Sequence, residues 1–509
     1  MDGPLLVLDR RDGVPLGAQL VDGVRRGILG GLLAPGDAVP STRALAAELG
    51  VSRSSVVAAY EQLAGEGYLE LRQGAPTRVA RLVVEHEASA PPPDRMPANP
   101  SGRAALGEHP VHRIDLLPGS PSTARIDERA WRSAWRQAAA APIPRLSPPR
   151  AGLTGLREEI ADHLRRARGV ACTSDDVVVT AGTSDAVALL GAALLELGRD
   201  RDARHGTASG PPVVAVEHPG YPSARRLLER RGLEIAPLPV DADGLDLAAL
   251  QRLPRPPQAV MITPSHQYPL GGRLPVASRL ELIDWARGAG ALIIEDDYDS
   301  EFRHLGAPLP ALASLDRLGA ANPANPDDGP RAAARTVLVG SFSKVLTPWL
   351  RIGYLVLPGD PALRAAIDRI RADETCPVPG VAQEAMRAFL ASGALRRHIA
   401  ATRRDYAHRR RMVQDALDGL PGAPLSGLDG GLHAVVGLAD AETSARIVAR
   451  LADDGVAVAP LADYSAVAGV RPGGLVFGYA GVGDALLGEG LARIRAALVE
   501  TLDLRGDAD

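Results

Sequence analysis

Lys344 is the only lysine among the 57 lysine and arginine residues of this chain, and it lies within the segment Ser341–Arg351. Arginine can supply positive charge at a surface, but its guanidinium stays protonated and cannot become the nucleophilic amine that condenses with a carbonyl. A deprotonated lysine can form such an imine. Random loss of lysine from an arginine-rich protein is the alternative interpretation. The solitary lysine predicts an imine-forming residue.

An acid and a phenol follow a short apolar run, Ala291–Ile294, that is typical of a buried strand. Side chains alternate between the two faces of a strand, so Asp296 and Tyr298 should share one face while Asp297 points to the other. Ligands of open α/β sheets gather at the carboxyl ends of the strands. We therefore expect Asp296 and Tyr298 to face one pocket.

Glycine, hydroxyl and guanidinium groups near two other predicted strands could hold a phosphate. One set opens the predicted helix 186–197, where backbone N–H groups of a helix N-terminus attract anions. The other set surrounds the lysine and ends in an arginine that can bind phosphate with two parallel hydrogen bonds. The predicted phosphate-binding residues are Gly182, Thr183, Ser184, Ser341, Ser343 and Arg351.

Together these groups are what pyridoxal 5′-phosphate (PLP) requires. The cofactor needs an amine for an internal aldimine, an acid opposite the pyridine nitrogen, a phenol near the ring oxygen, and hydroxyls with an arginine around the phosphate. Lys344, Asp296, Tyr298 and Arg351 supply these groups. Each of them alone has an ordinary structural explanation, as a capping or solvated side chain. Their combination predicts a PLP site.

The first 80 residues show helix-turn-helix spacing. A helix from Leu45 reaches a tight turn at Gly50, and Ser52 is placed to cap a second helix. Two short strands around a turn follow, as in a wing. The N-terminal end of such a second helix enters the major groove of double-stranded DNA, although a purely protein-binding helical domain is the alternative. The predicted DNA-binding residues are Arg43, Ser52, Arg53, Ser54, Ser55 and Arg72.

The remainder of the chain alternates helical segments with short buried-strand patterns, which predicts a mostly parallel sheet with crossover helices. A segment rich in proline and alanine separates this part from the first 80 residues and is typical of an extended linker. We therefore predict an α/β protein with three parts, residues 12–80, the linker 81–113 and residues 114–505. A second proline-rich segment, 320–334, is interpreted as a surface insertion.

Whole-chain properties exclude several other classes. The net charge of −4 draws the chain neither to DNA nor to anionic lipid, so DNA contacts must come from a local patch. Cys172 and Cys376 lack metal-like spacing, which favours buried thiols and no structural metal. The N-terminus resembles no signal peptide, and the longest apolar helical segment is too short to span a bilayer. We expect a cytoplasmic protein.

Two resemblances extend this interpretation. Residues 15–79 closely resemble the winged helix of GntR-type bacterial repressors, with one departure, Ala75-Pro76, at the wing tip. Residues 114–502 resemble fold-type I aminotransferases, through Gly155-Leu-Arg-Glu-Glu-Ile, Glu217-His-Pro-Gly-Tyr, Thr263-Pro-Ser-His-Gln-Tyr-Pro-Leu-Gly and the lysine segment. The resemblance implies that Lys344 is the Schiff-base lysine, Asp296 the pyridinium partner, Tyr298 the donor to the ring hydroxyl and Tyr221 a residue lining the cofactor pocket.

The joined architecture is similar to that of MocR/GabR-type transcription regulators, which implies a head-to-tail homodimer. It also implies a PLP-dependent regulator that senses the cofactor, or a small amine or amino acid, through the aldimine at Lys344, without turnover beyond residual transaminase half-reactions. An active aminotransferase carrying a DNA-binding arm is the alternative, and a sensor that has lost its cofactor is a third.

Two features limit the resemblance. Aminotransferases grip the substrate carboxylate with an arginine on the C-terminal strand, where this chain has Val476, and Arg471 is displaced. A basic cluster at residues 403–411 is interpreted as a solvated helix face or as a track for DNA phosphates.

Overall fold

The computed structural model describes residues 16–29, 33–34, 36–65, 69–70, 76–79, 114–205, 210–304, 310–321 and 334–506. The chain forms two compact units, and the boundary between them lies between Ala98 and Asn99. The predicted linker 81–113, Arg72, Ala75 and most of the insertion 320–334 lie outside the described residues. The bounds 12–80, 81–113 and 114–505 therefore stay predictions.

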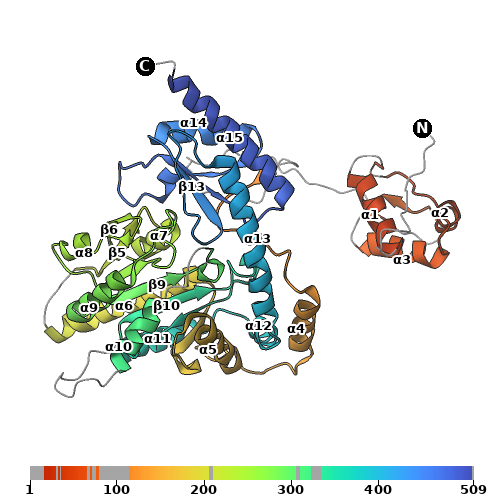
Figure 1. Ribbon diagram of the computed structural model, residues 1–509. Coiled ribbons are helices and arrows are strands. Elements are labelled where there is room, and N and C mark those ends of the chain that lie inside the picture. Colours follow the sequence, from red (N-terminus) through yellow and green to blue (C-terminus); the bar gives the residue numbers. More distant parts are fainter. Residues whose placement is uncertain are drawn as a thin grey trace, which may run out of the picture. The chain divides into compact units, whose positions relative to one another are not determined.

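Three helices and a pair of short strands build the first unit (Figure 1). Strands β1 and β2 pair antiparallel, with Leu69 opposite Val79. The bounds are α1 Leu16–Leu29, α2 Thr42–Leu49, α3 Arg53–Gly65, β1 Leu69–Glu70 and β2 Arg78–Val79.

Local sequence explains the turn between α2 and α3. Gly50 ends α2 in the left-handed conformation, with φ 62°, which glycine adopts without steric penalty. The hydroxyl of Ser52 accepts a hydrogen bond of 3.1 Å from the backbone N–H of Ser55, and so caps α3. One side of α3 is buried, through Val56, Ala59, Tyr60 and Leu63.

An eight-stranded sheet organises the second unit. The strand order is β4-β11-β10-β9-β8-β5-β6-β7, and the four pairs from β10 to β6 are parallel. A mostly parallel sheet is thereby confirmed. The strands are β4 Val177–Thr180, β5 Val213–His218, β6 Glu234–Asp241, β7 Gly244–Leu245, β8 Ala259–Ile262, β9 Leu292–Asp297, β10 Thr336–Ser341 and β11 Gly353–Val356.

Helices cover both faces of this sheet (Figure 1). Alternation along β5 sends Val214 and Val216 into the apolar core under α6, α7 and α11, while Ala215 joins the core under α8, α9 and α10. The helices are α5 Thr154–Arg168, α6 Thr183–His205, α7 Pro222–Arg230, α8 Leu247–Gln251, α9 Val276–Ala289, α10 Leu312–Ala321 and α11 Pro361–Glu374.

A smaller subdomain follows the large sheet. Its antiparallel sheet has the order β12-β13-β16-β15, and β14 pairs in parallel with β3 from the beginning of this unit. Its elements, with α4 from earlier in the chain, are β3 Ile114–Asp115, α4 Glu128–Ala140, α12 Gly380–Ala391, α13 Ala394–Leu417, β12 Leu425–Ser426, β13 His433–Gly437, α14 Ala441–Asp453, β14 Val456–Ala457, β15 Ala459–Pro460, β16 Gly474–Gly478 and α15 Asp484–Gly506.

Four 3-10 turns complete the described elements, η1 Ser174–Asp176, η2 Ser300–Phe302, η3 Pro348–Leu350 and η4 Leu461–Tyr464. Both cysteines are free, buried thiols, as predicted, and burial raises the pKa of each. Among the described helices, none is long and apolar enough to cross a membrane.

Candidate cofactor site

Neighbouring strands bring the lysine and the acid together. Strand β10 runs parallel to β9 with Val339 opposite Asp296, and Lys344 follows three residues after β10 ends. The Lys344 amine donates a 2.6 Å hydrogen bond to the carbonyl of Gly119. This contact with a distant segment holds the amine in the partly buried site.

Asp296 carries an unmet hydrogen-bonding capacity. Its side chain is buried, with 5% exposure, and its Oδ1 has no hydrogen-bond partner in the described part of the chain. Burial raises its pKa to about 7, and the nearby carboxylates of Asp297 and Glu217 act in the same direction, while Lys344 opposes them. A cationic N–H placed at Oδ1 would satisfy the orphaned oxygen and favour the ionised carboxylate.

Asp297 lies on the opposite face of β9. Its Oδ2 accepts a 2.7 Å hydrogen bond from Nε of Arg168, at the end of α5. The alternation along the strand thus separates a structural carboxylate from the one that faces the site.

Tyr298 has hydrogen-bond contacts with His266 in this structure. Its hydroxyl donates to the backbone carbonyl of His266 at 3.0 Å and also lies 3.0 Å from Nδ1 of the same residue. Burial raises the pKa of Tyr298 well above its usual value, so the phenol keeps its proton. The hydroxyl is a ready donor, already engaged by His266.

The predicted phosphate-binding groups converge at the N-terminus of α6. Gly182 has φ +82°, and a Cβ built there would lie 3.9 Å from Cζ of Arg351 and 4.0 Å from Oγ of Ser343. Thr183 is the first residue of α6 and Ser184 is exposed beside it. Glycine, hydroxyl, guanidinium and helix N-terminus therefore surround one small space.

Two side chains near the N-terminus of α6, those of Asp185 and Ser341, accept hydrogen bonds from other groups of the protein. Asp185, in the first turn of α6, accepts from the backbone N–H of Ala181 and from Arg371 at 2.6 Å. The hydroxyl of Ser341 accepts from the backbone N–H of Ser343 at 3.1 Å. Ser341 thus shapes the lysine loop, while Ser343 lies nearer to Gly182.

Tyrosines cluster around this site, and two of them, Tyr268 and Tyr464, were not among the predicted site residues. Tyr268 contacts Tyr221, Tyr298 and Tyr464 edge-on, with ring centroids 6.1, 5.6 and 5.4 Å away. The hydroxyls of Tyr268 and Tyr464 lie 3.3 Å apart. Tyr268 stands inside the quoted motif at 263–271, but Tyr464 lies far away in sequence on η4, where no local pattern marks it.

Val476 occupies the strand position where an aminotransferase has its carboxylate-binding arginine, and it contacts this tyrosine cluster. Val476 on β16 is fully buried and packs in one apolar group with Val435, Leu461 and Tyr464. Arg471 precedes β16 and is exposed. Of the guanidinium groups near this cluster, that of Arg225 lines a cavity together with Tyr221 and Tyr464.

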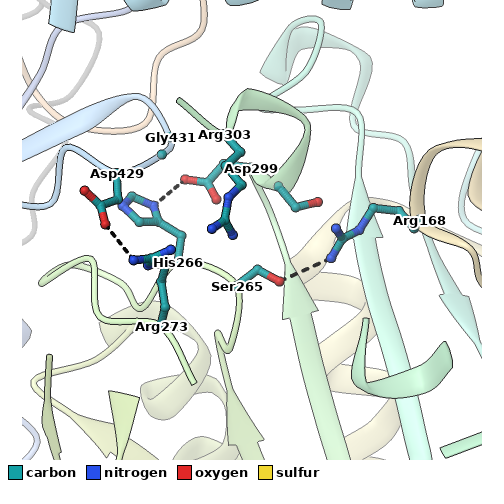
Figure 2. Close-up of a pocket in the computed structure, with 10 residues that line it drawn as sticks. Arg168, Ser265, His266, Arg273, Asp299, Arg303, Asp429 and Gly431 are labelled. Atoms are coloured by element: carbon teal, nitrogen blue, oxygen red, sulfur yellow. Dashed lines mark hydrogen bonds and ion pairs between the residues drawn. The ribbon is translucent and has the colours of Figure 1, made fainter. Parts of the chain in front are cut away.

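His266 links the phenol to the smaller subdomain. Its Nδ1 donates to Asp299 at 2.8 Å, its Nε2 donates to the carbonyl of Gly427 at 3.2 Å, and Figure 2 shows the first of these contacts. Burial opposes a charge on His266, but the Asp299 carboxylate outweighs it and raises the pKa. His433, whose pKa falls to about 3 through burial and the charge of His266, donates to Pro269.

These three groups, His266, Asp299 and His433, lie close enough together to hold a metal ion. Their hydrogen bonds already engage both nitrogens of His266 and the Nε2 of His433. The cluster is therefore explained as a buried hydrogen-bonded network.

The arrangement fits PLP. Asp296 offers an unsatisfied oxygen for a pyridinium N–H, Lys344 offers the amine, and the space beside Gly182 offers donors for a phosphate. These features belong to the chain's own geometry and match the cofactor's three chemically distinct parts.

Comparisons with known proteins agree with both units. The family profile described as "Aminotransferase class I and II" matches residues 115–494, and "Bacterial regulatory proteins, gntR family" matches residues 16–79. The chain is 40% identical to the HTH-type pyridoxine biosynthesis transcriptional regulator PdxR of Corynebacterium glutamicum, over 93% of this chain and 94% of that protein. The chain belongs to the MocR/GabR-type transcription regulators.

A second relative is the probable rhizopine catabolism regulatory protein MocR of Rhizobium meliloti, 31% identical over 97% of this chain and 96% of that protein. The α-aminoadipate aminotransferase LysN of Thermus thermophilus shares the fold of the large unit, with TM-score 0.66 and 23% identity over 77% of this chain and 93% of that one. This member of the family is a DNA-binding transcription regulator, and its cofactor is PLP.

The predicted DNA-binding residues have different local surroundings. Arg43, Arg53 and Ser54 are exposed at the ends of α2 and α3. The hydroxyl of Ser52 lies 2.8 Å from that of Ser54 and 2.7 Å from that of Ser55, so the serines form a hydrogen-bonded group around the cap.

Several arginines of the basic cluster on α13 bond other elements of the large unit. Arg409 is buried and bonds Asp484 at 2.8 Å, and Arg403 and Arg410 donate to the carbonyls of Glu301 and Leu428. These three arginines therefore join elements of the large unit, a role that neither the solvated helix face nor the DNA track had predicted.

Proposed function

We propose that this regulator reports the supply of its own cofactor: PLP bound at Lys344 is the signal, and no amino-acid substrate is needed. The carrying observation is the tyrosine cluster around Val476, at the place where an aminotransferase holds the substrate carboxylate. Val476 is buried against Tyr464, and Tyr464 contacts Tyr268 beside Tyr221. A carboxylate at this strand position would meet the apolar side chain of Val476 in place of the guanidinium that an aminotransferase offers.

The relatives support this assignment of the signal. The Corynebacterium glutamicum relative is named as a regulator of pyridoxine biosynthesis, and it matches this chain at 40% identity over almost its full length. A regulator of that pathway gains by sensing the end product. We propose that genes for PLP supply are the targets here, in the cytoplasm where the chromosome lies.

Each site residue has a proposed task. When bound, PLP supplies an aldehyde that reacts with an amine and a ring that withdraws electrons. Lys344 would hold that aldehyde covalently, Asp296 would keep the ring nitrogen protonated through Oδ1, and Tyr298 would donate to the ring hydroxyl. Tyr221 would line the cofactor pocket.

The N-terminus of α6 would hold the phosphate. The residues proposed for this task are Gly182, Thr183, Ser184, Ser343 and Arg351, with Ser341 supporting their loop. The proximity of Gly182, Ser343 and Arg351 supports this assignment.

Tyr298 offers a physical route from cofactor to conformation. A phenol that donates to the cofactor's ring oxygen must give up its present bond to the carbonyl of His266, and His266 also bonds Gly427 of the smaller subdomain. Cofactor binding thus changes a contact that spans the two subdomains. Coupling to DNA requires only that the resulting states differ in affinity for the operator.

The DNA and dimer contacts are part of the proposal. Arg43, Arg53, Ser54 and Arg72 would contact phosphates or base edges, with Ser52 and Ser55 shaping the end of α3. A head-to-tail homodimer would bury large apolar side chains that are now exposed, among them Ile143 at 95%, Leu146 at 86% and Trp349 at 90%.

The test is operator binding by purified PLP-free protein, titrated with PLP, and then with candidate amines and amino acids. We expect PLP alone to change the affinity or footprint of the wild type and to leave Lys344→Ala unchanged. A response that needs an amino acid in addition to PLP would overturn the signal assignment. Accumulation of a keto-acid product would instead support an active aminotransferase carrying a DNA-binding arm.

A further inference from the structure

A polar cavity lies beside His266. Loops after β8 and β9, the end of α5 and the glycine-rich loop between β12 and β13 surround it (Figure 2). Its walls carry three guanidinium groups, two hydroxyls, two carboxylates and an imidazole. The residues that line it include Arg168, Arg273, Arg303, Ser265, Ser300 and Asp429.

The carboxylates at the rim are already engaged by cations. Asp299 accepts from His266 at 2.8 Å, and Asp429 lies 3.0 Å from Arg273. The third arginine, Arg303, has its guanidinium directed toward the middle of the cavity in Figure 2. Burial lowers its pKa, and the positive charges of Arg273 and Arg168 lower it further, against the opposing effect of Asp429. Like charges thus meet in a partly enclosed space.

Hydroxyl donors complete the cavity. The Oγ of Ser300 is buried and has no hydrogen-bond partner in the described part of the chain. The Oγ of Ser265 accepts from Nη2 of Arg168 at 3.2 Å, which leaves its own proton available to another acceptor. Arg168 itself is 7% exposed, so its position is fixed by the protein interior.

The geometry points to a second anion site in this cavity, separate from the cofactor site, that takes a phosphate group. Guanidinium groups from three elements and two serine hydroxyls match the several oxygens of a phosphate, and Arg168 and Arg273 are also paired with Asp297 and Asp429. A cationic ligand would add its own repulsion to that between the crowded arginines. The phosphate could be inorganic phosphate or the ester group of a second vitamin B6 phosphate.

An occupant would also join two parts of the unit. Arg303 pairs in a short antiparallel bridge with Gly430, so the cavity wall includes both the large-sheet loop and the smaller subdomain. The ligand would strengthen the contact on which His266 and Gly427 also depend. Occupancy should therefore raise the thermal stability of the large unit.

The experiment uses full-length protein with PLP already bound at Lys344, as judged by its visible absorbance, so that the cofactor's phosphate site is filled. Inorganic phosphate and pyridoxine 5′-phosphate, which has no aldehyde, are titrated separately at matched ionic strength. Calorimetry gives the dissociation constant and thermal unfolding gives the Tm. Saturable binding of either probe supports the site, and the stronger probe identifies the source.

Two variants locate the binding. Arg303→Gln should weaken it by about tenfold or more, because a charged hydrogen-bond donor is lost. Ser300→Ala should weaken it several-fold without harming the fold, since its hydroxyl has no partner to lose among the described residues. The control, Arg230→Gln, removes an exposed charge outside the cavity.

Binding unchanged in both cavity variants would overturn the proposal, as would no saturable binding of either probe to the wild type. Neither result would touch the cofactor at Lys344, whose absorbance is followed in the same samples.

Discussion

Lys344 and Asp296 show how two single residues acquire their chemistry from neighbouring strands. The parallel register of β9 and β10 brings them to one end of the sheet, and burial leaves one oxygen of Asp296 without a partner among the described residues. The amine and the orphaned oxygen are complementary to opposite ends of one cofactor. Neither residue would be distinctive on an exposed surface.

The lysine can be tested with a charge-preserving substitution. Lys344→Arg keeps the positive charge but removes the amine that forms an imine, so it should lose the visible absorbance of the bound cofactor as completely as Lys344→Ala does. We expect PLP affinity to fall by about a hundredfold or more in both variants, measured by absorbance and equilibrium dialysis. Retained absorbance in Lys344→Arg would show that positive charge, and not imine formation, is what the site requires of this residue.

Asp296 predicts a pH dependence of stability in the PLP-free protein. Its folded-state pKa of about 7 lies above the ordinary 3.8, so between these values the folded protein holds a proton that the unfolded chain releases. Stability should therefore fall as pH rises through this window, by at most about 4 kcal/mol. Asp296→Asn carries no such charge, so the Tm of the variant relative to the Tm of the wild type should rise between about pH 5 and about pH 8.

The matched control for this measurement is Asp284→Asn, which changes a largely exposed carboxylate on α9. Its Tm should follow that of the wild type across the same range. Parallel curves for all three proteins would contradict a buried, protonated Asp296.

The sequence allowed these residues to be recognised because each stands within a local pattern. Lys344 is the only one of its kind, and Asp296 follows an apolar strand with the spacing that places it at the strand end. Tyr464 and His266 were not predicted as site residues, because their roles depend on contacts between distant segments. One such contact is the 3.3 Å distance between the hydroxyls of Tyr464 and Tyr268. The hydrogen bond from Tyr298 to the carbonyl of His266 could not be predicted from the sequence for the same reason.

Helix α3 is the element on which DNA recognition should depend. Ser52 caps the helix, so its loss should destabilise the first unit, whereas Arg53 is exposed and accessible to a ligand. The prediction that Ser52 caps this helix is confirmed, whereas DNA contacts by Ser52 and Arg53 stay predictions. A cap and a phosphate ligand require the same hydroxyl chemistry, so the sequence pattern predicted both roles for Ser52.

Arg53→Ala should weaken operator binding by about tenfold and reduce the salt slope of binding by about one, if its guanidinium contacts a phosphate. Fluorescence anisotropy at several salt concentrations measures both quantities. Glu61→Gln, farther along the same helix, serves as the control and should bind at least as well as the wild type. An unchanged salt slope with lower affinity would indicate a base contact in place of a phosphate contact.

The loop between β12 and β13 is a second element with a strict steric requirement. Gly431 has φ +74°, and a Cβ there would lie 2.3 Å from Oδ2 of Asp299 and 2.6 Å from the ring of His266. Gly431→Ala should destabilise the large unit by about 2 kcal/mol or more, since backbone strain and a displaced hydrogen-bonded pair act together.

Gly290→Ala is the matched control, because Gly290 has φ +66° but no atom within 4 Å of the added Cβ. It measures the backbone contribution alone. Thermal unfolding should show a clearly larger loss for Gly431→Ala, and equal losses would mean that the loop yields without disturbing His266.

At the scale of the whole molecule, two units with separate cores hold the DNA-binding domain and the cofactor-binding domain. The first unit holds its own apolar cluster around α1, α2 and α3, and the second holds the sheet and the cofactor site. Alternating strand and helix patterns predicted this organisation, because buried parallel strands and crossover helices each leave a strong local signal. The placement of one unit against the other depends on no such pattern.

The exposed apolar side chains make the last prediction, which concerns assembly. Trp349 is 90% exposed on η3, five residues after Lys344 and two before Arg351, and Ile143 is 95% exposed in the segment after α4. Burying a tryptophan removes a large apolar area from water, so residues of this kind dominate protein interfaces. If they lie in the dimer interface, Trp349→Glu should raise the dimer dissociation constant by about a hundredfold, as measured by sedimentation velocity.

Leu280→Glu, which places the same charge at an apolar position on α9 that is 47% exposed, should sediment like the wild type. Because Arg351 follows Trp349 so closely, a dimer formed through this surface would also order the phosphate-binding groups, and the Trp349→Glu monomer should bind PLP more weakly. A Trp349→Glu protein that remains dimeric would place the interface elsewhere, and full PLP affinity in a monomer would show that each site is complete within one chain.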